Sequence, residues 1–68
     1  MRAIVLNRLN DCIEIVVLDN KDAKSKEKIE AQIEYCAGCD IADVSYMLCE
    51  GIEVPIFLNG GDEPIATI

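Results

Sequence analysis

The fold of this chain is decided by residues 3–18, AIVLNRLNDCIEIVVL, in which two runs rich in β-branched residues flank Asn10 and Asp11. Asn and Asp adopt positive φ more readily than other non-glycine residues, so a tight turn is expected between the two runs. A β-hairpin centred on this pair places Leu6 opposite Ile15. The stretch therefore predicts two antiparallel strands at the start of the chain.

Both faces of this hairpin are apolar. One face carries Ile4, Leu6, Ile13, Ile15 and Val17. The other carries Ala3, Val5, Val16 and Leu18, beside Asn7 and Glu14. A strand with one solvated face alternates apolar with polar residues, and this pattern does not. We therefore expect both faces to be covered, and a second copy of the chain is one candidate for the second face.

Residues 20–38 predict a helix. A short side-chain oxygen at Asn20 or Asp22 can cap its first turn, and Gly38 stands where a left-handed closing residue is expected. The apolar stripe of this helix consists of Ile29, Ile33, Cys36 and Ala37. Glu30 and Glu34 lie outside that stripe.

Residues 40–51 fit two structures. As a helix, the segment begins at Asp40 and ends at Gly51; as a strand, it alternates over residues 44–49. We predict the strand over residues 44–49.

The last part of the chain predicts a closing hairpin. Residues 52–58 alternate, Pro55 belongs at a sheet edge or bulge, and Asn59-Gly60-Gly61-Asp62 is a strong turn pattern. Pairing across this turn sets Ile56 opposite Ile65. The predicted fold is α+β: one antiparallel sheet of four to five strands, in the order β-β-α-β-β-β, with one helix packed on one face.

The chain has 68 residues, of which 13 are acidic and 6 are basic, and its net charge is −7. This length corresponds to a single domain, residues 1–68. Its apolar runs are far shorter than the roughly 18 residues of a membrane span, and the N-terminal run is too short for a secretory signal. We therefore expect a cytoplasmic protein with no membrane association.

The composition also bears on catalysis. The chain contains no His, the side chain best suited to proton transfer near neutral pH. A domain this small has difficulty forming the walled pocket that enzymes use. We expect a protein that is not an enzyme and that uses no cofactor.

The acidic excess lies in the second half of the chain. Residues 29–68 hold eight acidic residues and no basic residue, whereas residues 1–28 hold all six basic residues. Such a half repels phosphate backbones, so nucleic-acid binding is not expected, but it attracts a basic protein. The candidate binding residues are Glu30, Glu34, Asp40, Asp43, Glu50 and Glu53.

Four cysteines form a second group of interest. Cys36 and Cys39 have the spacing of a redox dithiol and of half a zinc site. A redox dithiol needs its first thiol at a helix N-terminus, whereas this pair stands at a predicted C-terminus. Closing a zinc site would require Cys12 and Cys49, which occur singly. Small buried core residues are the more ordinary interpretation of free cysteines.

The leading hypothesis is a small acidic protein-binding module that acts as an inhibitor or adaptor, docking its acidic half or an exposed sheet edge on a basic protein surface. The first alternative is a metal-binding or redox protein that uses Cys36 and Cys39. The second alternative is a self-associating structural domain, a homodimer formed through the first hairpin.

Overall fold

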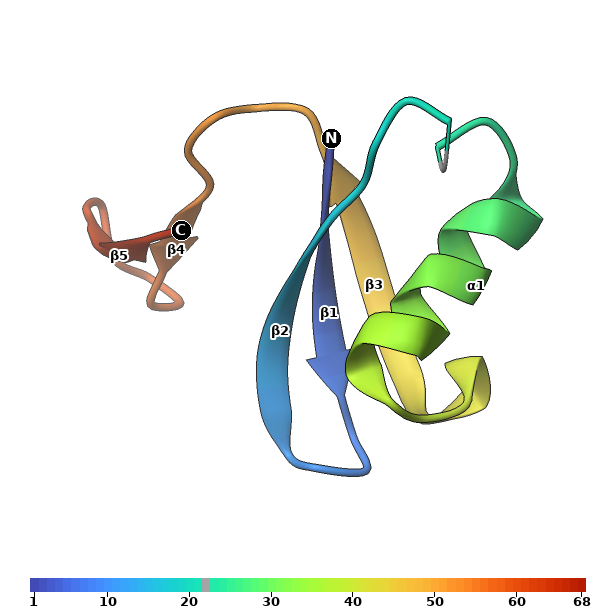
Figure 1. Cartoon of the computed structure of the whole chain (residues 1–68). Coiled ribbons are helices and arrows are strands. Elements are labelled where there is room, and N and C mark those ends of the chain that lie inside the picture. Colours follow the sequence, from blue (N-terminus) through green and yellow to red (C-terminus); the bar gives the residue numbers. More distant parts are fainter. Residues whose placement is uncertain (22) are drawn as a thin grey trace.

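Figure 1 shows the fold in a computed structural model of the chain, which describes residues 1–21 and 23–68. The elements follow the predicted order, with a short 3₁₀ helix added before the third strand. They are β1 (Arg2–Asn7), β2 (Cys12–Val17), α1 (Lys26–Ala37), η1 (Ile41–Asp43), β3 (Val44–Cys49), β4 (Pro55–Phe57) and β5 (Pro64–Thr67).

The first three strands form an antiparallel sheet in the order β2-β1-β3. The predicted register of the first hairpin was wrong by two residues, because Leu6 pairs with Ile13 rather than Ile15. The cause is a four-residue turn, Arg8–Asp11, in which Asp11 adopts the positive φ of 54°. A shift of two residues keeps every side chain on its face, so the two predicted faces are confirmed.

The prediction of a single sheet was wrong, because β4 and β5 form a separate two-stranded sheet. Pro55 and Pro64 open these two strands, and proline has no backbone N–H to donate to a neighbouring ladder. Among the described residues, these two strands pair only with each other. Small α+β remains the correct class: one helix, a three-stranded sheet and a two-stranded sheet.

The closing hairpin also pairs differently from the prediction. Ile56 lies opposite Ala66 instead of Ile65, and the register shifts between Ile56 and Phe57. The β-bulge at this point inserts one extra residue into β5, Ile65, which has no partner in β4. The predicted register counts residues evenly from the turn and so does not include this extra residue.

The helix begins later than predicted. Its N-cap is Ser25, whose Oγ accepts a hydrogen bond from the backbone N–H of Lys28 at 3.2 Å. Asn20 lies in a turn before the helix, and Asp22 falls outside the described residues. Because of the later start, Lys21 and Lys24 precede the helix. They are therefore not in its first turn, the place where the helix dipole disfavours cations. Within the described part of the chain, no helix is long and apolar enough to cross a membrane.

The end of the helix and the following strand agree with the sequence. Gly38 closes the helix with a φ of 71°, in the left-handed region. The strand predicted at residues 44–49 is β3. The competing helical pattern survives only as η1, which Asp40 caps by accepting a hydrogen bond from the Ala42 N–H at 3.3 Å.

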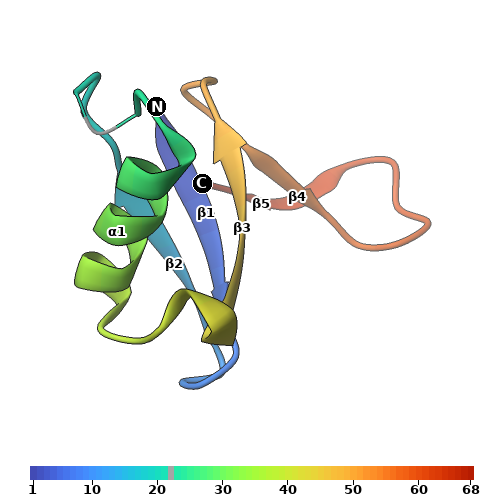
Figure 2. The same cartoon turned by 90° about the vertical axis from the view of Figure 1, so that its right-hand side faces the viewer.

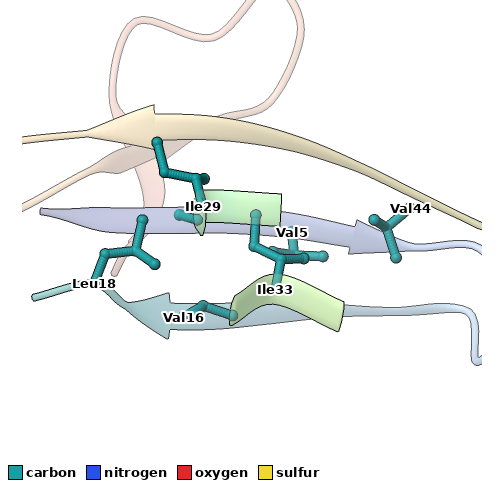
Figure 3. Close-up of a cluster of buried hydrophobic side chains, with 7 residues drawn as sticks. Val5, Val16, Leu18, Ile29, Ile33 and Val44 are labelled. Carbon is teal, nitrogen blue, oxygen red and sulfur yellow. The ribbon is translucent and has the colours of Figure 1, made fainter. Parts of the chain in front are cut away.

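The core lies between α1 and one face of the three-stranded sheet (Figure 3). Its buried residues are Ala3, Val5, Val16, Leu18, Ile29, Ile33 and Val44. Ile33 is completely buried, whereas Cys36 of the predicted stripe is exposed. The helix thus covers the face of β1 and β2 that carries Val5 and Val16.

Candidate functional site

The second face of the three-stranded sheet has no cover in the described chain. We call it the open face; its side chains are Arg2, Ile4, Leu6, Ile13, Ile15, Val17, Ser45, Met47 and Cys49. Its five most exposed apolar side chains are between 42% and 69% exposed. These are Leu6, Ile13, Ile15, Val17 and Met47. The apolar pattern that predicted a covered surface therefore lies exposed in the single chain.

The structure separates the six predicted acidic residues into two groups. Glu30, Glu34, Asp40 and Asp43 lie on α1, on η1 or in the turn between them, and we call them the acidic edge. Glu50 and Glu53 lie in the loop that follows β3. Asp43 and Glu50 flank the six residues of β3, so they lie roughly 23 Å apart along the strand. The first group comes from consecutive elements, α1, the turn after it and η1, which lead into β3.

Tyr46 links this acidic edge to the sheet. Its hydroxyl donates a hydrogen bond to Glu30 Oε2 at 2.9 Å, which places the carboxylate beside the middle of β3. Burial raises the pKa of Tyr46, and the hydrogen bond to Glu30 and the charge of that carboxylate raise it further. The sequence carried no spacing that would have paired these two residues.

Glu34 holds the other end of the acidic edge. Its Oε2 accepts a hydrogen bond from the backbone N–H of Ile41 at 3.0 Å, which ties α1 to η1. Asp43 ends η1 directly before β3 begins. Backbone N–H groups therefore position the carboxylates of Glu34 and Asp40, whereas the Tyr46 hydroxyl positions that of Glu30.

Two of the lysines lie on another flank of the helix. Lys21 and Lys28 line a shallow hollow with Ala31, Gln32 and Tyr35. Glu30 and Glu34 instead face β3 and η1. Lys26 stands four residues before Glu30 in α1 and so lies on the same side of the helix as Glu30, which leaves Lys21 and Lys28 as the lysines placed apart from the acidic edge.

One member of this surface was absent from the sequence-based candidates. Glu27 lies three residues before Glu30 and seven before Glu34, so all three share one side of the helix. Its helical spacing was the available signal, but Glu27 was counted with the basic half of the chain.

The acidic edge runs beside a free sheet edge. Among the described residues, β3 pairs only with β1. The Arg8 N–H donates to the Asp43 carbonyl at 3.0 Å, so this carbonyl points toward β1. Backbone groups alternate in direction along an antiparallel strand, so those of Tyr46 and Leu48 point outward. The β3 edge thus offers unpaired backbone groups next to carboxylates.

The cysteines do not converge on a metal site. All four thiols are free, and among the described residues no group of three or more His, Cys, Asp or Glu side chains is placed to hold a metal ion. Burial raises the pKa of Cys39, and the charges of Asp43, Glu14 and Asp40 raise it further. A raised pKa disfavours the thiolate that both metal binding and thiol exchange require.

The chain matches no family model, no curated protein and no solved structure. Arguments about its function therefore rest on the geometry of these surfaces.

Proposed function

We propose that the chain is a small acidic, non-enzymatic protein-binding module that docks on a basic protein surface through the β3 edge and the acidic edge beside it. The observation that carries the proposal is the position of Glu30 and Glu34, held against β3 and η1, with Lys21 and Lys28 on another flank of α1. Occupying a basic surface of a larger protein makes such a module an inhibitor or an adaptor.

The β3 edge specifies the kind of segment that binds. A strand added beside β3 directs alternate side chains to the two faces of the sheet. On the helix side these side chains meet the acidic edge, and on the other side they extend the open face near Met47. An extended segment that alternates basic and apolar residues satisfies both faces, so this is the partner class we assign.

Attraction between these charges also predicts how salt affects binding. Charged groups that line one surface speed association and select an oppositely charged partner, and salt screens them with a Debye length of about 8 Å at physiological ionic strength. Affinity for a basic segment should therefore fall steeply between low and physiological salt. An affinity that does not depend on salt would remove the electrostatic part of the proposal.

The test uses a fluorescently labelled peptide of alternating lysine and valine, titrated with the protein at physiological salt. The edge variant carries Glu30→Gln, Glu34→Gln, Asp40→Asn and Asp43→Asn, which keep hydrogen-bond acceptors while removing four charges. The control variant removes four charges elsewhere: Glu50→Gln, Glu53→Gln, Asp62→Asn and Glu63→Gln. Both variants have the same net charge, so only the position of the lost charges differs.

We expect the edge variant to bind at least tenfold more weakly than the wild type, and the control variant to bind within about twofold of it. The amide resonances of Tyr46 and Leu48 should shift on peptide addition to the wild-type protein. Equal loss in both variants would contradict the assigned surface. Equal binding of a peptide with its lysines in one block and its valines in another would exclude strand addition.

A further inference from the structure

The C-terminal arm, residues 52–68, is the part of the chain with the least cover. A two-stranded hairpin is marginal by itself in water, yet every residue of β5 is exposed. Four apolar residues of the arm are between 53% and 93% exposed. These are Ile52, Phe57, Leu58 and Ile65. Among the described residues, these apolar side chains of the arm therefore have little cover from their own chain.

The base of the arm is fixed at one end of the sheet. The Arg2 guanidinium donates hydrogen bonds to the carbonyls of Gly51 at 3.1 Å, Ile52 at 2.8 Å and Ile68 at 3.2 Å. Backbone hydrogen bonds between Val54 and Ile68, at 2.7 and 2.9 Å, close the hairpin above it. Figures 1 and 2 show the arm standing away from the sheet on the side opposite α1.

The arm and the open face are complementary in charge. The cations at the two ends of the open face are Arg2 and Arg8, whose Nη1 donates to Ser45 Oγ. None of the nine side chains of the open face is a carboxylate. The arm contains Glu53, Asp62 and Glu63 and no basic residue. Two copies of an acidic chain can therefore meet here without bringing carboxylates together.

The areas of the two surfaces indicate that they act together. With about 180 Å² for a fully exposed aliphatic residue, the exposed fractions leave about 500 Å² of apolar surface on the open face and a similar area on the arm. A stable complex buries about 800 Å² on each partner. The open face alone falls short of this area, whereas the face and the arm together exceed it.

We infer that the chain forms a two-fold symmetric dimer in which the arm of each copy lies over the open face of the other. The occupant of the open face is thus a second copy of this chain, and the symmetry covers both faces and both arms at once. The inference is argued from the open face and the arm and uses none of the carboxylates of the acidic edge, so it does not depend on the proposed function.

The test is sedimentation equilibrium of the full chain over a range of concentrations, with three double variants. The face variant carries Ile13→Thr and Met47→Thr. The arm variant carries Phe57→Ser and Ile65→Thr. The control variant carries Leu9→Ser and Tyr35→Ser, which change exposed apolar residues of the first turn and of the helix. The arm variant alters no core residue, and circular dichroism reports whether each variant is folded.

We expect a wild-type dimer, at least tenfold weaker association in the face and arm variants, and association within about twofold of wild type in the control. A mixture of the face variant and the arm variant should associate more tightly than either alone, because one intact arm then meets one intact face. A wild-type monomer at millimolar concentration would overturn the inference. An arm variant that dimerises like the wild type would also overturn it.

Discussion

The two faces of the three-stranded sheet carry similar apolar residues, but α1 covers one face and leaves the other exposed. On the covered face, Ala3 and Val5 are fully buried beneath α1, with Ile33 seated between the strands and the helix. On the open face, Ile13 and Val17 are more than half exposed. Alternate residues of the same strands supply both faces. The difference shows that the fold is stabilised through one face, whereas the other face stays exposed in the single chain.

The first prediction compares one isoleucine from each side of the sheet. Ile33→Ala removes a fully buried side chain and should lower the free energy of unfolding by about 3 kcal/mol, most of the stability of a domain this small. Ile13→Thr should change it by less than about 0.5 kcal/mol at concentrations where the chain is monomeric. Urea denaturation followed by circular dichroism measures both. Similar losses would mean that the two faces are not distinct.

The second prediction concerns Asn7, the buried polar residue among those described on the covered face. Its amide donates to Glu14 Oε2 at 2.9 Å, and its Oδ1 accepts from the Asn10 N–H at 3.0 Å. Asn7→Ala leaves the Glu14 carboxylate and the Asn10 N–H without these hydrogen bonds and should lower the free energy of unfolding by about 2 kcal/mol. Asn59→Ala, at an exposed turn, is the matched control. Equal effects in urea denaturation would contradict a stabilising role for Asn7.

The third prediction concerns the cap of the helix that covers the sheet. Ser25→Ala removes the acceptor of the Lys28 N–H and should lower stability by about 1 kcal/mol. Ser25→Asp retains an acceptor and should stay close to the wild type. Thermal unfolding distinguishes the two variants. If both variants lowered the midpoint of thermal unfolding equally, Ser25 would not act as the N-cap of the helix.

The fourth prediction concerns Tyr46 and depends on pH. The pKa of Tyr46 is raised in the folded protein, so its protonated hydroxyl adds stability that is complete below the ordinary tyrosine pKa of about 10. That stability is lost as the pH rises through the raised value. Tyr46→Phe should therefore lower the free energy of unfolding by about 1 kcal/mol at pH 7. The difference between variant and wild type should shrink at strongly alkaline pH. Urea denaturation across this range measures it; a constant difference would contradict the assignment.

The local features of the fold could be predicted from the sequence. Hydrophobic alternation assigned the side chains of β1 and β2 to the correct faces, and residues 44–49 were correctly identified as a strand. Gly38 closed the helix because only a residue tolerant of positive φ fits there. These features depend on neighbours a few residues away.

The remaining features depend on contacts between distant residues. The separation into two sheets involves Arg2 and the carbonyls of residues 51, 52 and 68, which no local pattern reports. The acidic edge depends on the contact between Glu30 and Tyr46, 16 residues apart. The sequence therefore supplied the candidate carboxylates but not the grouping that separates four of them from Glu50 and Glu53.

We propose that the open face binds a second copy of the chain. The most direct test is an isotope-filtered NMR experiment on equal parts of labelled and unlabelled chain. Only contacts between two copies give signals in this experiment. We predict intermolecular contacts from the Phe57 ring of one copy to the methyl groups of Leu6 and Met47 in the other. A concentrated sample with no intermolecular signal at those methyl groups would contradict the claim.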